Sequence, residues 1–345
     1  MALTVQEIEN IANQTLDFYI KNEIGKETIQ DKPLLKALRA KQKTFPGGKE
    51  YIRGNVKGDY TTEFMGYSHD DTVSYSNPAN VKQFEYPWRE LHAGIELSAT
   101  ELKKAGFTIA DTTTGERAEP ASQRELVAIT NLLQDKYEDM DEGTQRSLNK
   151  MLWLDGTQDA KEIPGVQAYV TATPTTGVVA GIDRGANSWW RNRVSLGISA
   201  SATNQTLTKT LRSEVRQLRR YGGRPSLWLA GSAFIEALED EIQAKGTYTQ
   251  TGFGDKSSTD ISMAEISIKG IGTVMYDPTL DDLSKQKYAY VLDERAMQLH
   301  VMDGEDMKMH YPARPHDKYV FYRAMTLTAG LIFKRFTSSG VYSIA

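Results

Sequence analysis

The sequence contains no cysteine among its 345 residues. Disulfide bonds, thiolate metal ligands and a cysteine nucleophile are therefore excluded. It also lacks any run of the roughly 18 to 20 apolar residues that a membrane-spanning helix needs. Met1–Ile20 contains polar residues throughout, without the apolar segment of a secretory signal peptide. These absences fit assembly in a reducing cytoplasm, and we expect no membrane partner.

Positive charge is not in excess. The chain has 41 Lys and Arg against 45 Asp and Glu, which gives a net charge of -4. Domains that read nucleic acid usually show a basic excess, so the charge argues against sequence-specific DNA recognition. The hydrophobic share of 39% and the charged share of 25% are those of an ordinary globular protein. The length suffices for two or three regions, each with its own core.

Short motifs of the common enzyme classes are missing as well. There is no GxSxG elbow, no GxxxxGK[ST] phosphate loop, no GxGxxG turn and no HExxH zinc motif. His310, His316 and Asp317 are close enough in sequence to ligate a metal, but Pro312 and Pro315 between them indicate an ordinary turn. We therefore predict a non-enzyme without catalytic residues, metal or cofactor.

The first hundred residues change from a helical to an extended pattern. A capping box at Thr4–Glu7 and the apolar spacing of Pro33–Leu38 predict two short helices in an arm that must dock elsewhere. Glu50–Lys57 and the alternating run Phe84–Leu97 predict two strands of a long hairpin. Their connection has about twenty mostly polar residues and should project, because such loops are unusual inside a compact domain. A slip in the alternation beside Pro87 predicts a bulge or bend.

The rest of the chain predicts a long helix and then a mixture of helices and strands. Apolar residues at helical spacing predict a helix over Pro120–Leu154, in which Gly143 allows a bend. Beyond it we expect strands at Val166–Thr171, Ser226–Ala230, Ile266–Tyr276, Tyr288–Leu292, Met297–Met302 and Met325–Phe336, helices at Asn204–Tyr221 and Gly231–Ala244, and a loop-rich insertion at Gly177–Arg193. The predicted fold class is α+β.

In this order the elements resemble the capsid fold of tailed bacteriophages and herpesviruses, known as the Hong Kong ninety-seven type. Four strings resemble that family too: Tyr86–Gly94, Gly181–Arg184 running into Trp189–Asn192, Leu227–Phe234, and Tyr311–Phe333. The resemblance covers essentially the whole chain. The resemblance rests on the four strings taken together and in this order, because no single string is diagnostic of the family.

The resemblance implies four regions. Residues 1–43 would be an N-terminal arm, and 44–98 an extended hairpin loop (E-loop) that overlaps a neighbouring subunit. Residues 99–155 with 319–345 would be a peripheral domain with the long spine helix, and 156–318 an axial domain whose tip surrounds the five-fold and six-fold centres.

The implied protein is a major capsid protein of the virion, assembled in the host cytoplasm. Its pentamers and hexamers would form an icosahedral head around packaged double-stranded DNA. In one branch of this family, loop lysines are joined covalently to asparagines. We match no such Lys/Asn pair in this sequence and expect no cross-link from the resemblance. Only 43 residues precede the hairpin region, so we expect a separate scaffolding protein, with a portal and a decoration or cement protein as further partners. An encapsulin-like compartment shell, or another phage structural oligomer such as a tail tube, is the alternative.

Aromatic residues supply most of the candidate subunit contacts. The candidates are Phe84, Tyr86, Trp88, Trp189, Trp190 and Arg191. The first three form one face of a hairpin that is marginally stable alone, and Trp and Arg are enriched in interface hot spots. Each set packs either on a neighbour or back on its own domain, and the sequence leaves both alternatives open.

Arg212, Arg216, Arg219 and Arg220 cluster on one predicted helix. They suit non-specific contact with DNA phosphates. Alternatively they form a solvated or inter-subunit face on which Glu214 and the helix dipole offset their charge. The sequence favours the second interpretation.

Overall fold

The computed structural model describes residues 3–4, 30–75, 77, 80–98, 109–110, 123–201, 204–244, 265–268, 272–310, 312 and 320–345. The chain divides into two compact units. Unit 1 comprises Met1–Asp31, Glu90–Leu148 and Gly304–Thr328, and unit 2 comprises Lys32–Arg89, Asn149–Asp303 and Ala329–Ala345. Each unit is discontinuous in sequence, so both depend on contacts between distant segments.

Unit 1 contains most of the long helix α4 (Gln123–Trp153), whose last residues belong to unit 2. Its 31 residues make it about 46 Å long at 1.5 Å per residue. The buried side chains Tyr137, Met140 and Leu148 recur at helical spacing and lie on one face. The structure confirms the expected long helix, which passes Gly143 without a break.

The strands of unit 1 are arranged around β18 (Val320–Phe333), whose last five residues belong to unit 2. Both β5 (Arg89–Ser98) and β17 (Lys308–His310) pair with β18. A separate parallel pair joins β1 (Leu3–Thr4) to β6 (Ile109–Ala110). The prediction of a helix from the capping box at Thr4–Glu7 falls, beyond Thr4, on residues outside the described part of the chain.

Unit 2 is built on a six-stranded sheet with the order β13-β14-β12-β15-β19-β9. Its strands are β9 (Arg193–Ile198), β12 (Leu227–Ala230), β13 (Glu265–Ile268), β14 (Gly272–Tyr276), β15 (Tyr288–Leu292) and β19 (Gly340–Ile344). Every residue of β12 is buried, because the strand is central and covered on both faces.

Two helices cover one face of this sheet. Leu211, Val215 and Leu218 of α6 (Leu207–Arg219) and apolar side chains of α7 (Ser232–Ala244) share a buried core with Trp228 of β12 and Tyr342 of β19. The last two rings stack with centroids 6.2 Å apart. This apolar core follows directly from the helical and alternating patterns of the two kinds of element.

The opposite face of the sheet receives the end of α4. The Trp153 ring lies 5.1 Å from the ring of Tyr290 in β15. Its Nε1 donates to Asp277 Oδ2 at 2.8 Å, and Asp277 Oδ1 accepts from the backbone N–H of Thr279 at 2.9 Å. Asp277 thereby caps α8 (Pro278–Asp282) and holds it to α4.

A second buried polar residue extends this network. Asn149 Oδ1 accepts from the backbone N–H of Leu35 at 3.2 Å in α2 (Pro33–Ala40), and Asn149 Nδ2 donates to Thr279 Oγ1 at 2.7 Å. The predicted helix at Pro33–Leu38 is therefore confirmed and is tied to the rest of unit 2 by Asn149.

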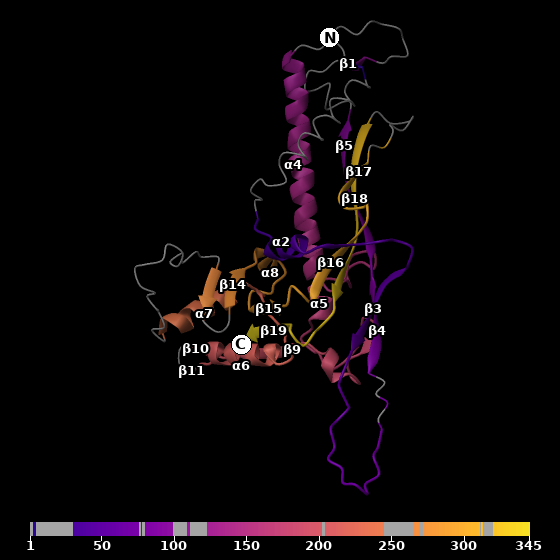
Figure 1. The fold of residues 1–345 in the computed structure, drawn as a ribbon. Helices are drawn as coiled ribbons and strands as arrows, with labels where there is room; N and C mark the ends of the chain where they lie inside the picture. Colours follow the sequence, from indigo (N-terminus) through magenta and orange to yellow (C-terminus); the bar gives the residue numbers. More distant parts are fainter. Residues whose placement is uncertain are drawn as a thin grey trace, which may run out of the picture. The chain divides into compact units, whose positions relative to one another are not determined.

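The remaining strands of unit 2 include the predicted hairpin. The strand β16 (Met297–Met302) pairs antiparallel with the end of β18 and parallel with β2 (Lys43–Phe45). The antiparallel strands β3 (Tyr51–Lys57) and β4 (Val81–Pro87) run side by side to the loop 58–80 (Figure 1). The chain leaves strand conformation at Trp88, which confirms the predicted irregularity beside Pro87.

The shorter elements are α5 (Val166–Tyr169), β7 (Val178–Val179), β8 (Ile182–Asp183), η2 (Ser188–Trp190), β10 (Ala200–Ser201) and β11 (Asn204–Gln205).

Two strand predictions are wrong. The expected strand Val166–Thr171 begins with the helical turn α5, because Val166, Tyr169 and Val170 have the i, i+3, i+4 spacing of a buried helix face. The run predicted as one strand, Ile266–Tyr276, contains two antiparallel strands, β13 and β14, and Gly272 begins the second with a φ of 131°.

The C-terminal strand β19 was not predicted. It pairs with β15 and β9 in the six-stranded sheet of unit 2. Residues 329–345 thus join the segments expected to form the axial domain, whereas the resemblance grouped them with the spine helix. The four-region division of the chain stays a proposal.

Replacing Asp277 with Ala tests this core. The change leaves Trp153 Nε1 and the Thr279 N–H without their acceptor, and each unpaired buried group costs about 1 to 3 kcal/mol. We expect the free energy of unfolding to fall by about 2 to 5 kcal/mol in urea denaturation. The control Asp159→Ala, at an exposed turn where Asp159 accepts from Lys161 N, should cost less than about 1 kcal/mol. Equal effects would contradict the role assigned to Asp277.

Candidate functional site

Six aromatic rings from four segments of unit 2 meet at the base of the hairpin. This aromatic cluster consists of Phe84, Tyr86, Tyr169, Trp190, Phe333 and Phe336. Neighbouring ring centroids lie 4.7 to 6.4 Å apart, within the range of favourable aromatic pairs. All six side chains are buried. The cluster therefore fixes the hairpin to its own unit.

Tyr86 is the central member of the cluster. Its hydroxyl donates to the backbone carbonyl of Phe333 at 2.7 Å, and its ring meets that of Tyr169 edge-on at 5.3 Å. Burial raises the pKa of Tyr86 well above its ordinary value, so the phenol stays protonated and keeps donating. This bond connects residues 247 positions apart in sequence.

Trp190 packs on the hairpin from η2. Its ring stacks against Phe84 at 6.4 Å and meets Phe336 edge-on at 4.7 Å. Its Nε1 donates to the carbonyl of Val179 at 3.0 Å. The Phe84 ring in turn lies over Gly54, its cross-strand partner, where a Cβ atom would come within 2.5 Å of the ring. A larger residue at position 54 would therefore displace the Phe84 ring.

A buried arginine completes the cluster. The Arg184 guanidinium lies 4.7 Å from the Phe336 ring centroid and donates to Thr171 Oγ1 at 3.1 Å and to the carbonyl of Tyr169. Burial lowers the pKa of Arg184 to about 10, which leaves it charged at neutral pH. Arg191 Nε donates to the Arg184 carbonyl at 2.6 Å, so it supports the same loop from outside.

Phe84, Tyr86 and Trp190, three of the candidate subunit contacts, pack inside their own unit, and their use as subunit contacts stays untested. Their side chains are buried within unit 2 because the distant segments at Tyr169 and Phe333 cover them. The alternative in which the aromatic face packs on its own domain is the one that the structure favours.

The two other tryptophans among the candidate subunit contacts, Trp88 and Trp189, are only partly buried. Trp88 Nε1 donates to the carbonyl of Lys49 at 2.8 Å, and its ring lies 6.4 Å from Phe45. Trp189 lies over Gly58, where an added Cβ would be 2.4 Å from the indole. Both therefore contact their own unit, and their use as subunit contacts stays untested.

The loop 58–80 carries the exposed apolar residues that the sequence analysis missed. The exposed large side chains are Tyr60, Phe64, Met65, Tyr67, Val73 and Tyr75, with relative exposures from 55% at Val73 to 110% at Phe64. Their spacing fits neither a helix nor a strand, and the sequence pattern therefore indicates only a mostly polar loop. The sequence signal that could have identified these residues is the presence of several aromatic residues within a long, otherwise polar tract.

The loop also has an ordered frame. Its ends meet where Gly58 N donates to the Asn80 carbonyl at 2.8 Å and Asn80 Nδ2 donates to the Asp59 carbonyl at 2.5 Å. Within it, a turn is closed by hydrogen bonds between Ser68 and Asp71 in both directions. The exposed rings are thus displayed on a loop whose base is fixed.

The basic face of α6 is exposed. Arg212, Arg216, Arg219 and Arg220 are all solvent-accessible, and Arg220 lies 5.5 Å from the Tyr221 ring centroid. Glu214 was expected to offset their charge, but both its oxygens accept from Arg193, each at 2.9 Å. Among the described residues, none of the four arginines forms an ion pair.

The histidines show no shared site in the described part of the chain. His310 Nε2 lies 2.7 Å from Thr326 Oγ1, while His316 and Asp317 fall outside it. No group of three metal-ligating side chains occurs among the residues that the structure describes. No helix within those ranges is long and apolar enough to span a membrane.

The fold is similar to solved capsid structures over nearly the whole chain. The cyanophage A-1(L) capsid asymmetric unit matches with a TM-score of 0.65 at 14% identity, covering 93% of this chain and 95% of that chain. The capsid of the native GTA particle matches with a TM-score of 0.55 at 12% identity, covering 95% and 98%. The capsid of Myoviridae phage XM1 matches with a TM-score of 0.54 at 12% identity, covering 94% and 95%.

These matches confirm the predicted α+β capsid fold. No protein-family model and no curated protein sequence matches the chain. The likeness is therefore visible in the fold and not in overall sequence identity.

Replacing Phe84 and Phe64 one at a time distinguishes the buried rings of the aromatic cluster from the exposed rings of the loop 58–80. Phe84→Ala removes a buried ring from the aromatic cluster and should lower the free energy of unfolding by about 3 to 5 kcal/mol. Phe64→Ala removes a fully exposed ring and should change it by no more than about 0.5 kcal/mol. Urea denaturation followed by tryptophan fluorescence measures both. A Phe84→Ala variant as stable as the unmodified protein would contradict the assignment of this ring to the core of unit 2.

Proposed function

We propose that this protein is a major capsid protein, whose pentamers and hexamers form the icosahedral head shell that encloses packaged double-stranded DNA. The main support is the likeness to capsid structures over more than nine-tenths of the chain. The exposed loop 58–80 is the observation on this chain that supports self-association. The role requires no catalytic chemistry, so the protein acts as a structural subunit and not as an enzyme.

The loop supplies the reach that such a subunit needs. A loop of this length without secondary structure of its own is uncommon in compact domains and usually serves binding. Phe64, Tyr67 and Tyr75 are aromatic anchors of the type that dominates interface energetics. The aromatic cluster holds the base of the hairpin, which lowers the entropic cost of docking the loop. Under the proposal these anchors contact a neighbouring subunit.

The basic face of α6 suits the enclosed DNA. Arg212, Arg216 and Arg219 are exposed, recur at helical spacing, and form no ion pair in the described ranges. Phosphate contacts of this kind are independent of sequence and sensitive to salt. We therefore assign this face to weak, non-specific DNA contact inside the shell. A separate scaffolding protein, a portal and a decoration protein remain expected partners, with assembly in the host cytoplasm.

Shortening the loop 58–80 tests its proposed contact with a neighbouring subunit. Replacing residues Asp59–Asn77 with a tight turn should preserve the fold, because loop-closure entropy changes slowly with length. Assembly should fail, since the shortened variant has neither the reach nor the aromatic anchors. Circular dichroism reports the fold and sedimentation velocity the particle size. Normal assembly of a folded, shortened variant would contradict the proposed contact.

Removing two arginines tests the DNA face. Arg212→Gln with Arg216→Gln should reduce the slope of log affinity against log salt by about 2, because each neutralised phosphate contributes about 0.9 to that slope. The control Lys161→Gln with Lys308→Gln removes the same charge from other exposed sites and should leave the slope nearly unchanged. Fluorescence anisotropy with a DNA duplex measures both, and identical slopes would count against a DNA-facing α6.

A further inference from the structure

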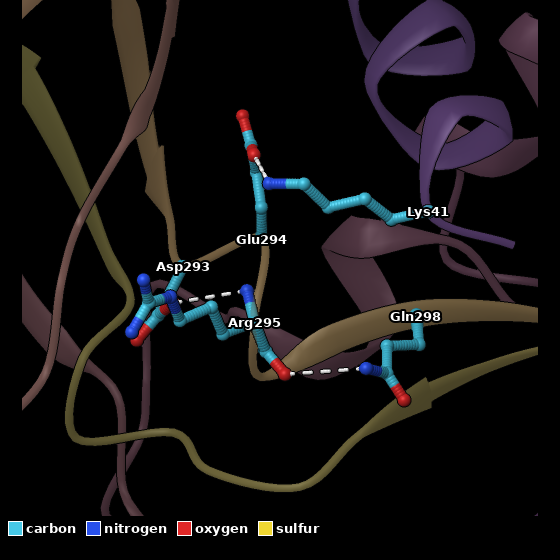
Figure 2. A network of polar contacts seen from close by, with 5 residues as sticks. All are labelled: Lys41, Asp293, Glu294, Arg295 and Gln298. Carbon is cyan, nitrogen blue, oxygen red and sulfur yellow. Dashed lines mark hydrogen bonds and ion pairs between the residues drawn. The ribbon is translucent and has the colours of Figure 1, made fainter.

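Hydrogen bonds bring three segments of unit 2 together beside the C-terminal end of α6. Asp293, in the turn between β15 and β16, is buried and uses both of its carboxylate oxygens as acceptors. Oδ2 accepts from the backbone N–H of Arg224 at 3.1 Å, and Oδ1 accepts from the backbone N–H of Arg295 at 3.0 Å. Figure 2 shows the second of these bonds. One buried carboxylate therefore fixes the backbones of two arginines that are far apart in sequence.

The turn after β18 joins the same place. The backbone N–H of Lys334 donates to the carbonyl of Ala296 at 2.9 Å, and Ala296 is the residue that follows Arg295. Arg335 Nη1 donates to the carbonyl of Tyr221 at 3.2 Å, two residues beyond the end of α6. These two bonds tie the turn after β18 both to the turn between β15 and β16 and to the end of α6.

Four basic residues at this meeting point form what we call the basic patch. They are Arg224, Arg295, Lys334 and Arg335, and all four are exposed. None of the four forms an ion pair among the described residues. The patch adjoins the basic face of α6, which ends directly before Tyr221. Because the whole chain has a net charge of -4, this gathering of positive charge is a local feature of one surface.

The carboxylates nearest to the basic patch in sequence are already engaged. Asp293 accepts the two backbone hydrogen bonds described above. Glu294 pairs with Lys41, and Figure 2 shows how this pair ties the segment before β2 to the same turn. On α6, Glu214 pairs with Arg193 through both of its oxygens. The four positive charges of the patch outnumber the two carboxylates of the turn, which leaves positive charge for a partner of opposite sign.

The chemistry of the patch suits phosphate. The planar guanidinium of arginine donates two parallel hydrogen bonds to one phosphate group and adds a charge that is permanent at neutral pH. Arg224 and Arg295 are held through their backbone N–H groups, and neither side chain forms a hydrogen bond within the described part of the chain. Both guanidinium groups can therefore turn to a ligand without breaking an internal contact.

We propose that the basic patch binds the phosphate groups of a DNA duplex and forms one continuous phosphate-binding surface with the basic face of α6. Arg224 and Arg295 contact phosphates from the two sides of Asp293, and Lys334 and Arg335 extend the contact beside the end of α6. The inference rests on the proposed function, because the enclosed DNA supplies the ligand. Contacts with phosphates alone carry no sequence information, so the surface holds DNA of any sequence.

Replacing both Arg224 and Arg295 with Gln tests this surface in the full, unassembled chain. The backbone N–H groups that bond to Asp293 remain, so the turn keeps its framework and the circular dichroism spectrum should not change. Fluorescence anisotropy with a DNA duplex at several salt concentrations should show a slope of log affinity against log salt that is lower by about 2, because each neutralised phosphate contributes about 0.9. An unchanged slope in the folded double variant would overturn the inference.

Matched variants locate the effect. The control Lys82→Gln with Lys161→Gln removes the same charge from exposed positions elsewhere in unit 2 and should leave the slope nearly unchanged. An equal loss in the control would show an effect of net charge only and would overturn the site. Adding the two arginine substitutions proposed for α6 to the patch variant should lower the slope by about 4 in total, since one duplex contacts both. A total loss no greater than that of the α6 pair alone would contradict a continuous surface.

Assembly distinguishes DNA from a protein partner. In sedimentation velocity the patch variant should still form particles, because the patch contacts DNA and not a neighbouring subunit. Failed assembly of a folded variant whose salt slope is unchanged would assign the patch to a second copy of the chain and overturn the inference. If the unmodified protein binds DNA with the expected slopes but never assembles, the proposed function is refuted while the phosphate-binding surface stands, so the two failures are distinguishable.

Discussion

The packing of Tyr86 and Phe84 against Tyr169, Trp190 and Phe333 is the interaction on which the rest of unit 2 depends. It joins the hairpin, two short helical turns and the end of β18, segments that lie far apart in sequence. Burial of aromatic rings is the largest favourable contribution that single side chains make to such a core. Without this cluster the hairpin would have no fixed direction, because two isolated strands are only marginally stable in water.

The hairpin consequently has two parts with opposite roles. Its base uses aromatic rings for internal packing, while the loop 58–80 exposes rings of the same type to solvent. A large exposed apolar group is informative when it is displayed on a fixed base, because binding then costs little further conformational entropy. The exposed arginines of α6 are a further feature that the chain does not satisfy internally. Both features fit a subunit that is completed by its surroundings.

Local patterns were sufficient for much of the fold. The strands Tyr288–Leu292 and Met297–Met302 have the predicted bounds, and the long helix and hairpin are where apolar spacing placed them. The short helix at Val166 was missed because four to six apolar residues fit a strand or a helix turn equally well. β19 was missed because its partners lie far away in sequence.

The sites were harder to predict than the fold. Composition identified aromatic and basic residues, but Phe84 is buried through contacts with Trp190, more than a hundred positions away, whereas Phe64 is exposed. Likewise Glu214 lies two residues from both Arg212 and Arg216 on α6, yet it pairs with Arg193 at the start of β9.

The central claim is that this chain is a shell subunit. Electron microscopy of the purified protein at micromolar concentration, with and without a scaffolding partner, tests it most directly. The account predicts capsomers or closed shells in which pentamers and hexamers are visible, with the loop 58–80 of each subunit lying on a neighbour. A monodisperse species with the 38.6 kDa mass of a single chain under all conditions would contradict it.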